Sequence, residues 1–257
     1  MRQPEDPDCK IWRYTDFPKL VWMLQNSALY FCRTDKLGDP FEGSLPKKAR
    51  ERRTKQIQNT EAVRSAALFH VDPQETAREL KGADKSVVFH GRKYAFVNCW
   101  HMSDHESDAM WKLYGRTDGA VAIQSTYSLL DRELKNKRPN DSVKIGCVNY
   151  LDYEQDDIPG KRDDALSRVM IKPEAFACEQ ELRAVITHSL VPATKEGEDT
   201  TYSEHEVVHV NLDTLVEAVY VSPLAGEWFR DLVEDVLKHY AQAFPVKQSS
   251  LARDPMF

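Results

Sequence analysis

The apolar residues of this chain come in short runs, and this pattern constrains the fold more than any other feature. The longest runs, such as Ala120–Ile123, have the length of a β-strand and fall far short of the roughly 20 residues that a membrane-spanning helix needs. Such segments are mixed with amphipathic helical segments, and no repeat or low-complexity linker separates them. We therefore expect an α+β protein with a single domain over residues 1–257.

Local patterns predict where the strands and helices lie. Segments rich in alternating, β-branched or aromatic residues predict strands at Ile11–Thr15, Leu29–Arg33, Tyr94–Trp100, Gly119–Gln124, Val143–Tyr150, Glu181–Thr187, Val207–Val210 and Ala218–Val221. Helices are expected from an Asp16 N-cap to Asn26, and at Glu106–Tyr114, Asp163–Met170 and Gly226–Ala243, with an acidic loop near 195–203. A charged helical segment from Lys47, broken near Asp72-Pro73, predicts an inserted helical pair over about residues 46–84.

Charge and cysteine content restrict the partners and the compartment. The net charge of -6 argues against a protein that coats nucleic acid by bulk electrostatics. Within Lys47–Lys55, however, six basic residues stand against one acidic residue, and Lys48, Arg52 and Lys55 could contact the phosphates of a nucleic acid. The alternative is a solvated helix surface. The five cysteines are widely spread without a C-x-x-C, and the N-terminus lacks an apolar leader, so we expect reduced thiols, no metal and a cytoplasmic location.

The segment Glu179-Gln180-Glu181-Leu182-Arg183 is the strongest candidate for a functional site. Alternation at the start of a strand would put Glu179 and Glu181 on one side of the sheet. Two carboxylates so placed repel each other, which favours a cationic partner or a site that uses a shifted pKa. Arg183 follows on the same face and could be that partner, in which case the pair would be structural.

Four motifs in order resemble a family of bacterial domains whose function is not assigned. They are Trp12-Arg13-Tyr14, Asp39-Pro40-Phe41-Glu42, Met110-Trp111 with Tyr114 and Gly119, and Glu179-Gln180-Glu181-Leu182-Arg183. That family in turn resembles ADP-ribosyltransferases. The resemblance implies a split mixed β-sheet, NAD as a substrate, and a site divided among distant segments of the chain.

The resemblance also implies a role for each site residue. Arg13 would contact the pyrophosphate or ribose of NAD, Glu181 would be the catalytic glutamate, and Glu179 would orient the acceptor, while Tyr114 or Tyr14 would stack near nicotinamide. A carboxylate suits this chemistry, because breaking the bond between nicotinamide and ribose develops oxocarbenium charge. The acceptor could be RNA, DNA or protein, and the chain could be a toxin or antiphage effector with a neutralising partner protein.

Two other classes of function stay open from the sequence. The chain could bind a ligand or partner without chemistry. It could also be a metal-dependent nuclease that uses Asp39, Glu42, Glu179 and Glu181. Each site residue also has a structural alternative: Arg13 could pair with Glu42 or Glu181, and Tyr114 could be a packed tyrosine. Carboxylates converging on a cation would favour the nuclease.

Overall fold

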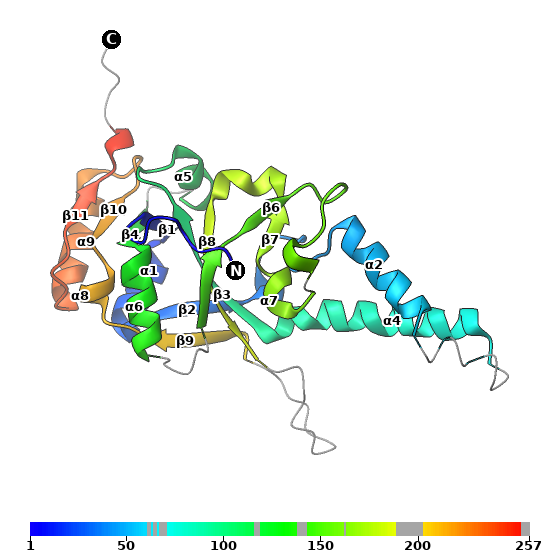
Figure 1. Ribbon diagram of the computed structural model, residues 1–257. Helices are drawn as coiled ribbons and strands as arrows, with labels where there is room; N and C mark the ends of the chain where they lie inside the picture. The colour runs from blue at the N-terminus through cyan, green and yellow to red at the C-terminus, as the bar shows by residue number, and fades with distance from the viewer. Residues whose placement is uncertain are drawn as a thin grey trace, which may run out of the picture.

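The computed structural model is a large β-sheet with helices packed against it and a pair of helices, α2 and α4, that projects to one side (Figure 1). It describes residues 1–60, 63, 66, 71–115, 119–137, 143–161, 163–188 and 203–252. The predicted acidic loop near residues 195–203 lies outside these ranges except for its last residue. None of the helices in the described ranges is long and apolar enough to cross a membrane.

Among the residues that the structure describes, the main sheet has nine strands and is mixed. Seven follow the order β11-β10-β4-β1-β3-β2-β9, and β8 joins β3 to β5. Within it β10 and β11 pair in parallel, whereas the other recorded pairs are antiparallel. The strands are β1 (Lys10–Asp16), β2 (Ala28–Arg33), β3 (Ala95–Met102), β4 (Ala120–Thr126), β5 (Val143–Cys147), β8 (Glu181–Thr187), β9 (His205–His209), β10 (Ala218–Val221) and β11 (Val246–Gln248).

The sheet forks at β3. One edge of this strand pairs with β8 from Ala95 to His101. The other edge is shared, because β1 pairs with its C-terminal end at His101 and Met102 while β2 pairs with its N-terminal end at Phe96 and Val97. Between these two contacts β1 and β2 diverge, and the edge of β3 is open to side chains from both.

Helices cover the two faces of the sheet unequally. The large core lies on one face, where α1 (Phe17–Asn26), α6 (Tyr127–Lys137), α8 (Leu212–Leu215) and α9 (Glu227–His239) pack. The other face carries α5 (Asp108–Tyr114), α7 (Ala165–Arg168) and a two-stranded parallel sheet of β6 (Asn149–Leu151) and β7 (Ile171–Pro173). Short 3-10 helices are η1 (Thr34–Lys36), η3 (Arg92–Tyr94), η4 (Pro159–Lys161), η5 (Glu174–Glu179) and η6 (Ser250–Ala252).

The projecting pair consists of α2 (Lys47–Gln58) and α4 (Pro73–Gly91). The predicted break at Pro73 is confirmed, since α4 begins there. The predicted end near residue 84 is wrong, because α4 runs on to Gly91. Gly82 disfavours a helix, but Arg53 of α2 forms an ion pair with Asp84 of α4 and also binds Asp163, and these tertiary contacts hold the helix in place.

The predicted α+β class with a split, mixed β-sheet and an inserted helical pair is therefore confirmed. Two strands, Glu181–Thr187 and Ala218–Val221, have the predicted bounds. The strand predicted over Val143–Tyr150 is instead two strands, β5 and β6, which belong to different sheets. The interruption falls at Val148, whose side chain is buried in a separate cluster with Val97 and Val185.

Candidate functional site

The two glutamates of the acidic motif meet because the chain turns sharply between them. Glu179 ends η5, and Glu181 begins β8. Gln180 between them has φ 39° and ψ 52°, the left-handed region. The expected reason for their proximity, alternation along one strand, is wrong because Glu179 lies outside the strand. Their proximity itself is confirmed, since Lys172 Nζ lies 2.5 Å from Glu179 Oε2 and 3.3 Å from Glu181 Oε2.

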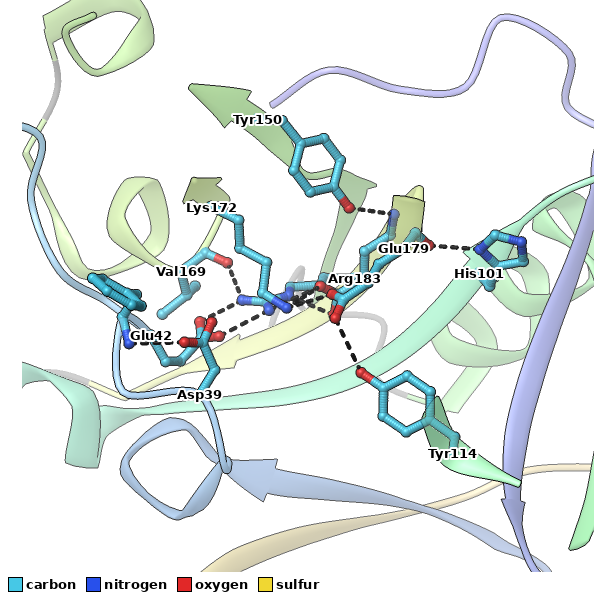
Figure 2. A network of polar contacts seen from close by, with 11 residues as sticks. Asp39, Glu42, His101, Tyr114, Tyr150, Val169, Lys172, Glu179 and Arg183 are labelled. Atoms are coloured by element: carbon cyan, nitrogen blue, oxygen red, sulfur yellow. Dashed lines mark hydrogen bonds and ion pairs between the residues drawn. The ribbon is translucent and has the colours of Figure 1, made fainter. Parts of the chain in front are cut away.

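Five charged residues form one buried network, shown in Figure 2, and we call it the carboxylate network: Glu42, Lys172, Glu179, Glu181 and Arg183. Arg183 donates through Nε and Nη2 to both oxygens of Glu181, at 2.8 and 2.9 Å, and through Nη1 and Nη2 to both oxygens of Glu42. Lys172 joins Glu181 to Glu179. Each of the six carboxylate oxygens thus has a recorded donor, since Tyr114 supplies the one for Glu179 Oε1.

The network holds Glu181 in its ionised form. Burial by itself would raise the pKa of this carboxyl, but the charges of Arg183 and Lys172, together with hydrogen bonds from Arg183 and Cys99, lower it to about 2. The same contacts raise the pKa of Lys172 and of Arg183 above their ordinary values, against the effect of their burial. Glu181 is therefore a fixed negative charge across the physiological pH range.

Tyr114 connects the network to the surface. Its hydroxyl donates to Glu179 Oε1 at 3.3 Å, and 49% of the residue is exposed. It ends α5, which begins with Ser107 accepting from Met110 N and packs Met110 and Trp111 against the sheet. Burial of the hydroxyl and the charge of Glu179 raise the pKa of Tyr114. The hydroxyl therefore stays protonated and can donate to a carboxylate at neutral pH.

Further aromatic rings and polar groups surround these carboxylates. Phe176 packs against the exposed Phe41 at 6.5 Å and lies 5.2 Å from Lys172 Nζ. Glu181 N donates to the Tyr150 hydroxyl, and His101 Nδ1 donates to the Glu179 carbonyl at 2.6 Å. Burial lowers the pKa of His101. These contacts fix the backbone on both sides of Gln180.

Tyr14 lies beside this site as a packed residue. It is buried, its ring contacts Trp111 at 5.0 Å and His101 at 6.1 Å, and its hydroxyl accepts from Ser107 N. Burial raises the pKa of Tyr14 to about 12. The structure therefore ties Tyr14 to the start of α5.

Arg13 lies in the fork of the sheet. Side chains along β1 point alternately to the two faces of the sheet. Arg13 therefore lies on the same face as Ile11, which belongs to the large core, whereas Trp12 and Tyr14 lie on the face that α5 covers. Its Nη1 donates to the Cys99 carbonyl at 3.2 Å. Burial, together with the charge of Glu181, raises the pKa of the Cys99 thiol. Among the described residues no carboxylate pairs with Arg13, and burial lowers its pKa. The structure thus brings Tyr114, Glu179 and Glu181 together. Arg13 is not brought to them, because it lies on the face of the large core and bonds the Cys99 carbonyl in the fork.

The basic residues of α2 lie apart from this site. Lys48 and Lys55 are exposed, and Arg52 forms an ion pair with Asp157. The three share an open surface of the helix with Glu51, Gln56 and Asn59. None of them contacts the carboxylate network through a recorded ion pair within the described residues.

The carboxylates named for a nuclease bind cations of the protein itself. Arg183 lies between Glu42 and Glu181, and Lys172 lies between Glu179 and Glu181. Asp39 Oδ1 accepts from Phe41 N and shapes its loop. Over the part of the chain that the structure describes, no group of three metal-ligating side chains is present.

Sequence reasoning missed Lys172 and the partners of Glu42. Lys172 is one lysine in a three-residue strand, and its spacing from Glu179 carries no motif. A pair of Arg13 with Glu42 or Glu181 was the structural alternative, but the partner of Glu42 is Arg183, 141 residues further along the chain. The Asp-Pro-Phe-Glu motif was the available signal, since it placed Glu42 in a loop of unusual composition.

Comparison with known proteins gives only a distant structural likeness. No family model and no curated protein matches the chain. A structure titled "Thermus sp. 2.9 DarT in complex with ADP-ribosylated ssDNA" aligns over 98% of each chain with a TM-score of 0.41 and 10% identity. Another, titled "Thermus sp. 2.9 DarT in complex with carba-NAD+", covers 97% of this chain and 98% of that one, with a TM-score of 0.40 and 9% identity.

Proposed function

We propose that this protein is an NAD-dependent ADP-ribosyltransferase with its site at the carboxylate network. One observation carries the proposal: the Tyr114 hydroxyl, from the third of the four ordered motifs, donates to Glu179 of the fourth, 65 residues away. Tertiary contact between motifs that are distant in sequence is what a site assembled from them requires. The support comes from this contact and the motif order, and the distant likeness to DarT adds none.

In the proposed reaction Glu181 stabilises the transition state. The bond between nicotinamide and the ribose breaks, its electron pair leaves with nicotinamide, and the positive charge that develops on the ribose needs a nearby anion. Glu181 is ionised and rigidly held, so it requires no reorganisation when that charge appears. Phe41 and Phe176 would limit water at the site and so reduce hydrolysis of NAD.

The remaining roles follow from accessibility. Glu179 accepts one recorded hydrogen bond on each oxygen, and a carboxylate has about four lone-pair sites, so it retains capacity to orient an acceptor. Tyr114 is exposed enough to stack near nicotinamide. Arg13 remains the proposed contact for the pyrophosphate or ribose, since a guanidinium suits paired phosphates. It would have to reach them through the fork of the sheet, because it lies on the same face as Ile11. The acceptor would be nucleic acid or protein, and the biological role that of a cytoplasmic toxin or antiphage effector.

Glu181→Gln tests the mechanism. The amide keeps the shape of the carboxylate but loses its charge, so nicotinamide release from NAD should fall by about 100-fold or more.

Tyr114→Phe removes one hydrogen bond to a charged group at a half-exposed position, and nicotinamide release should fall by about tenfold. Release would be measured chromatographically with purified protein and labelled NAD, in the presence of cell lysate as a source of acceptor.

The control is Asp163→Asn, which removes a partly buried carboxylate from Arg53 and Arg168 outside the network. It should also destabilise the protein, because the largely buried Arg168 loses an ionised partner, but nicotinamide release should remain. Unchanged release by Glu181→Gln, or equal loss in Asp163→Asn at matched folded fractions, would contradict the mechanism.

A second function, binding without chemistry, is favoured by one feature of the network. All six carboxylate oxygens of Glu42, Glu179 and Glu181 already have donors within the protein. A network satisfied in this way can be purely structural. Calorimetric binding of NAD by the wild type, without nicotinamide release under any acceptor condition, would identify this second function.

A further inference from the structure

A strongly basic cavity lies between the helical pair and the Asp-Pro-Phe-Glu loop. Its volume is about 700 Å³, and it is bounded by α2, α4 and the segment from Pro40 to Leu45. Six basic side chains line it: Arg50, Arg53, Arg78, Lys81, Lys85 and Arg92. Of the described residues, two carboxylates line it, Glu42 and Asp84, which leaves a lining charge of +4 in a protein whose net charge is -6.

The excess positive charge is not neutralised by those two carboxylates. Both oxygens of Glu42 bind Arg183, which lies outside the cavity, and both oxygens of Asp84 bind Arg53. Within the described ranges, no ion pair is recorded for Arg50, Arg78, Lys81 or Lys85, whereas Arg53 also binds Asp163. Like charges held this close repel one another, and a bound anion would relieve that repulsion.

The cavity also offers an apolar surface. Leu45, Ile57 and Val88 line it, and Leu45 belongs to a small core cluster against which Val88 packs. A volume between about 300 and 1,000 Å³ with an apolar wall and a few charged groups is typical of small-molecule sites. Cations alone would suit inorganic phosphate, whereas cations beside an apolar wall suit a molecule with both a phosphate and a planar ring.

We propose that this cavity binds a nucleotide, with its phosphates at Arg50, Arg78, Lys81 and Lys85 and its base against Leu45, Ile57 and Val88. The cavity adjoins the proposed transferase site at Glu42, which belongs to the carboxylate network. It differs from that site because Glu179, Glu181 and Tyr114 do not line it. The nucleotide could be free or be the phosphorylated end of a nucleic-acid strand. The proposal does not depend on transferase activity.

The test is calorimetric titration of the full chain with ADP, pyrophosphate and adenosine. ADP should bind more tightly than either fragment, because it alone reaches both the cations and the apolar wall. Arg50→Gln combined with Arg78→Gln should weaken ADP binding by about 100-fold, since each of the two lost charged contacts is worth roughly 1.4 kcal/mol, a factor of ten. Both residues are exposed, so the variant should keep its melting temperature.

The control is Lys19→Gln combined with Lys238→Gln. It changes the net charge by the same amount as the Arg50 and Arg78 variant, but at two exposed lysines outside the cavity, each in an ion pair of its own. It should leave ADP binding unchanged. Displacement of ADP by a short 5′-phosphorylated DNA strand would identify a strand end as the source, and failure to displace would identify a free nucleotide. ADP binding no tighter than adenosine, or equal weakening by the control or by Lys48→Gln with Lys55→Gln, would overturn the proposal.

Discussion

Gln180 carries backbone strain at the centre of the proposed site. Left-handed φ and ψ values are uncommon for residues other than glycine, because the Cβ atom approaches the neighbouring carbonyl. The side chain is exposed and contributes no core packing, so the conformation is imposed from both sides. Lys172 draws Glu179 and Glu181 together, and His101 and Tyr150 hold the adjoining peptide groups.

Gln180→Val should therefore lower the free energy of unfolding by about 1–2 kcal/mol, because a β-branched side chain raises the cost of the left-handed conformation. Gln180→Gly is the matched control and should not be less stable than the wild type, since glycine adopts this conformation without a steric cost. Urea unfolding would measure both. Equal stability of the valine and glycine variants would show that the turn relaxes without penalty.

At the scale of single elements, α1 shows how a local signal fixes a helix start. Asp16 closes β1 and accepts a hydrogen bond from Lys19 N at 2.9 Å, and Pro18 lies in the first turn. Leu20, Met23 and Leu24 then face the large core. The same aspartate therefore ends β1 and begins α1.

Asp16→Ala should cost about 1 kcal/mol, because it leaves a backbone N–H of the first turn without its partner. Asp16→Asn should cost much less. The amide retains the cap, and the ion pair with Lys19 that it loses is exposed and contributes little. Chemical denaturation of the two variants checks this, and a larger loss in the asparagine variant would contradict a capping role.

At the scale of the whole molecule, the carboxylate network ties together segments that are remote in sequence. Glu42 comes from a loop before α2, Lys172 from β7, Glu179 from η5, and Glu181 and Arg183 from β8. Breaking this network by protonation should therefore weaken the entire fold.

Acid should reduce stability in a defined window. The folded-state pKa of Glu181, about 2, is below its ordinary value of 4.5, so its contribution is present above pH 4.5 and is lost as the pH falls toward 2. That shift corresponds to about 3 kcal/mol. Asp157 and Asp163, whose pKa values are also lowered by ion pairs, add in the same direction. Urea unfolding at several pH values would measure how steeply the free energy of unfolding falls with pH. This slope should be shallower in Glu181→Gln than in the wild type. An unchanged slope would show that other groups cause the loss of stability.

The sequence by itself determined the local elements and the chemistry available to them. The Asp16 cap, the helix break at Pro73, the strand Glu181–Thr187 and the pairing of Arg183 with Glu181 all depend on residues close together in the chain. Short-range sterics and hydrogen bonding fix such features, so patterns of a few residues predict them.

Tertiary structure alone decided which distant groups met. Glu42 forms its ion pair with Arg183 and not with Arg13, and Lys172 binds both Glu179 and Glu181. Helix α4 continues past Gly82, where Asp84 binds Arg53 of α2. The helix over Tyr127–Lys137 was also not predicted, although Leu130 and Leu134 bury it against the large core. These outcomes depend on how the sheet forks at β3 and on which face of the sheet each side chain occupies. Residues far apart along the chain share no local sequence pattern, so the sequence alone does not predict that they meet.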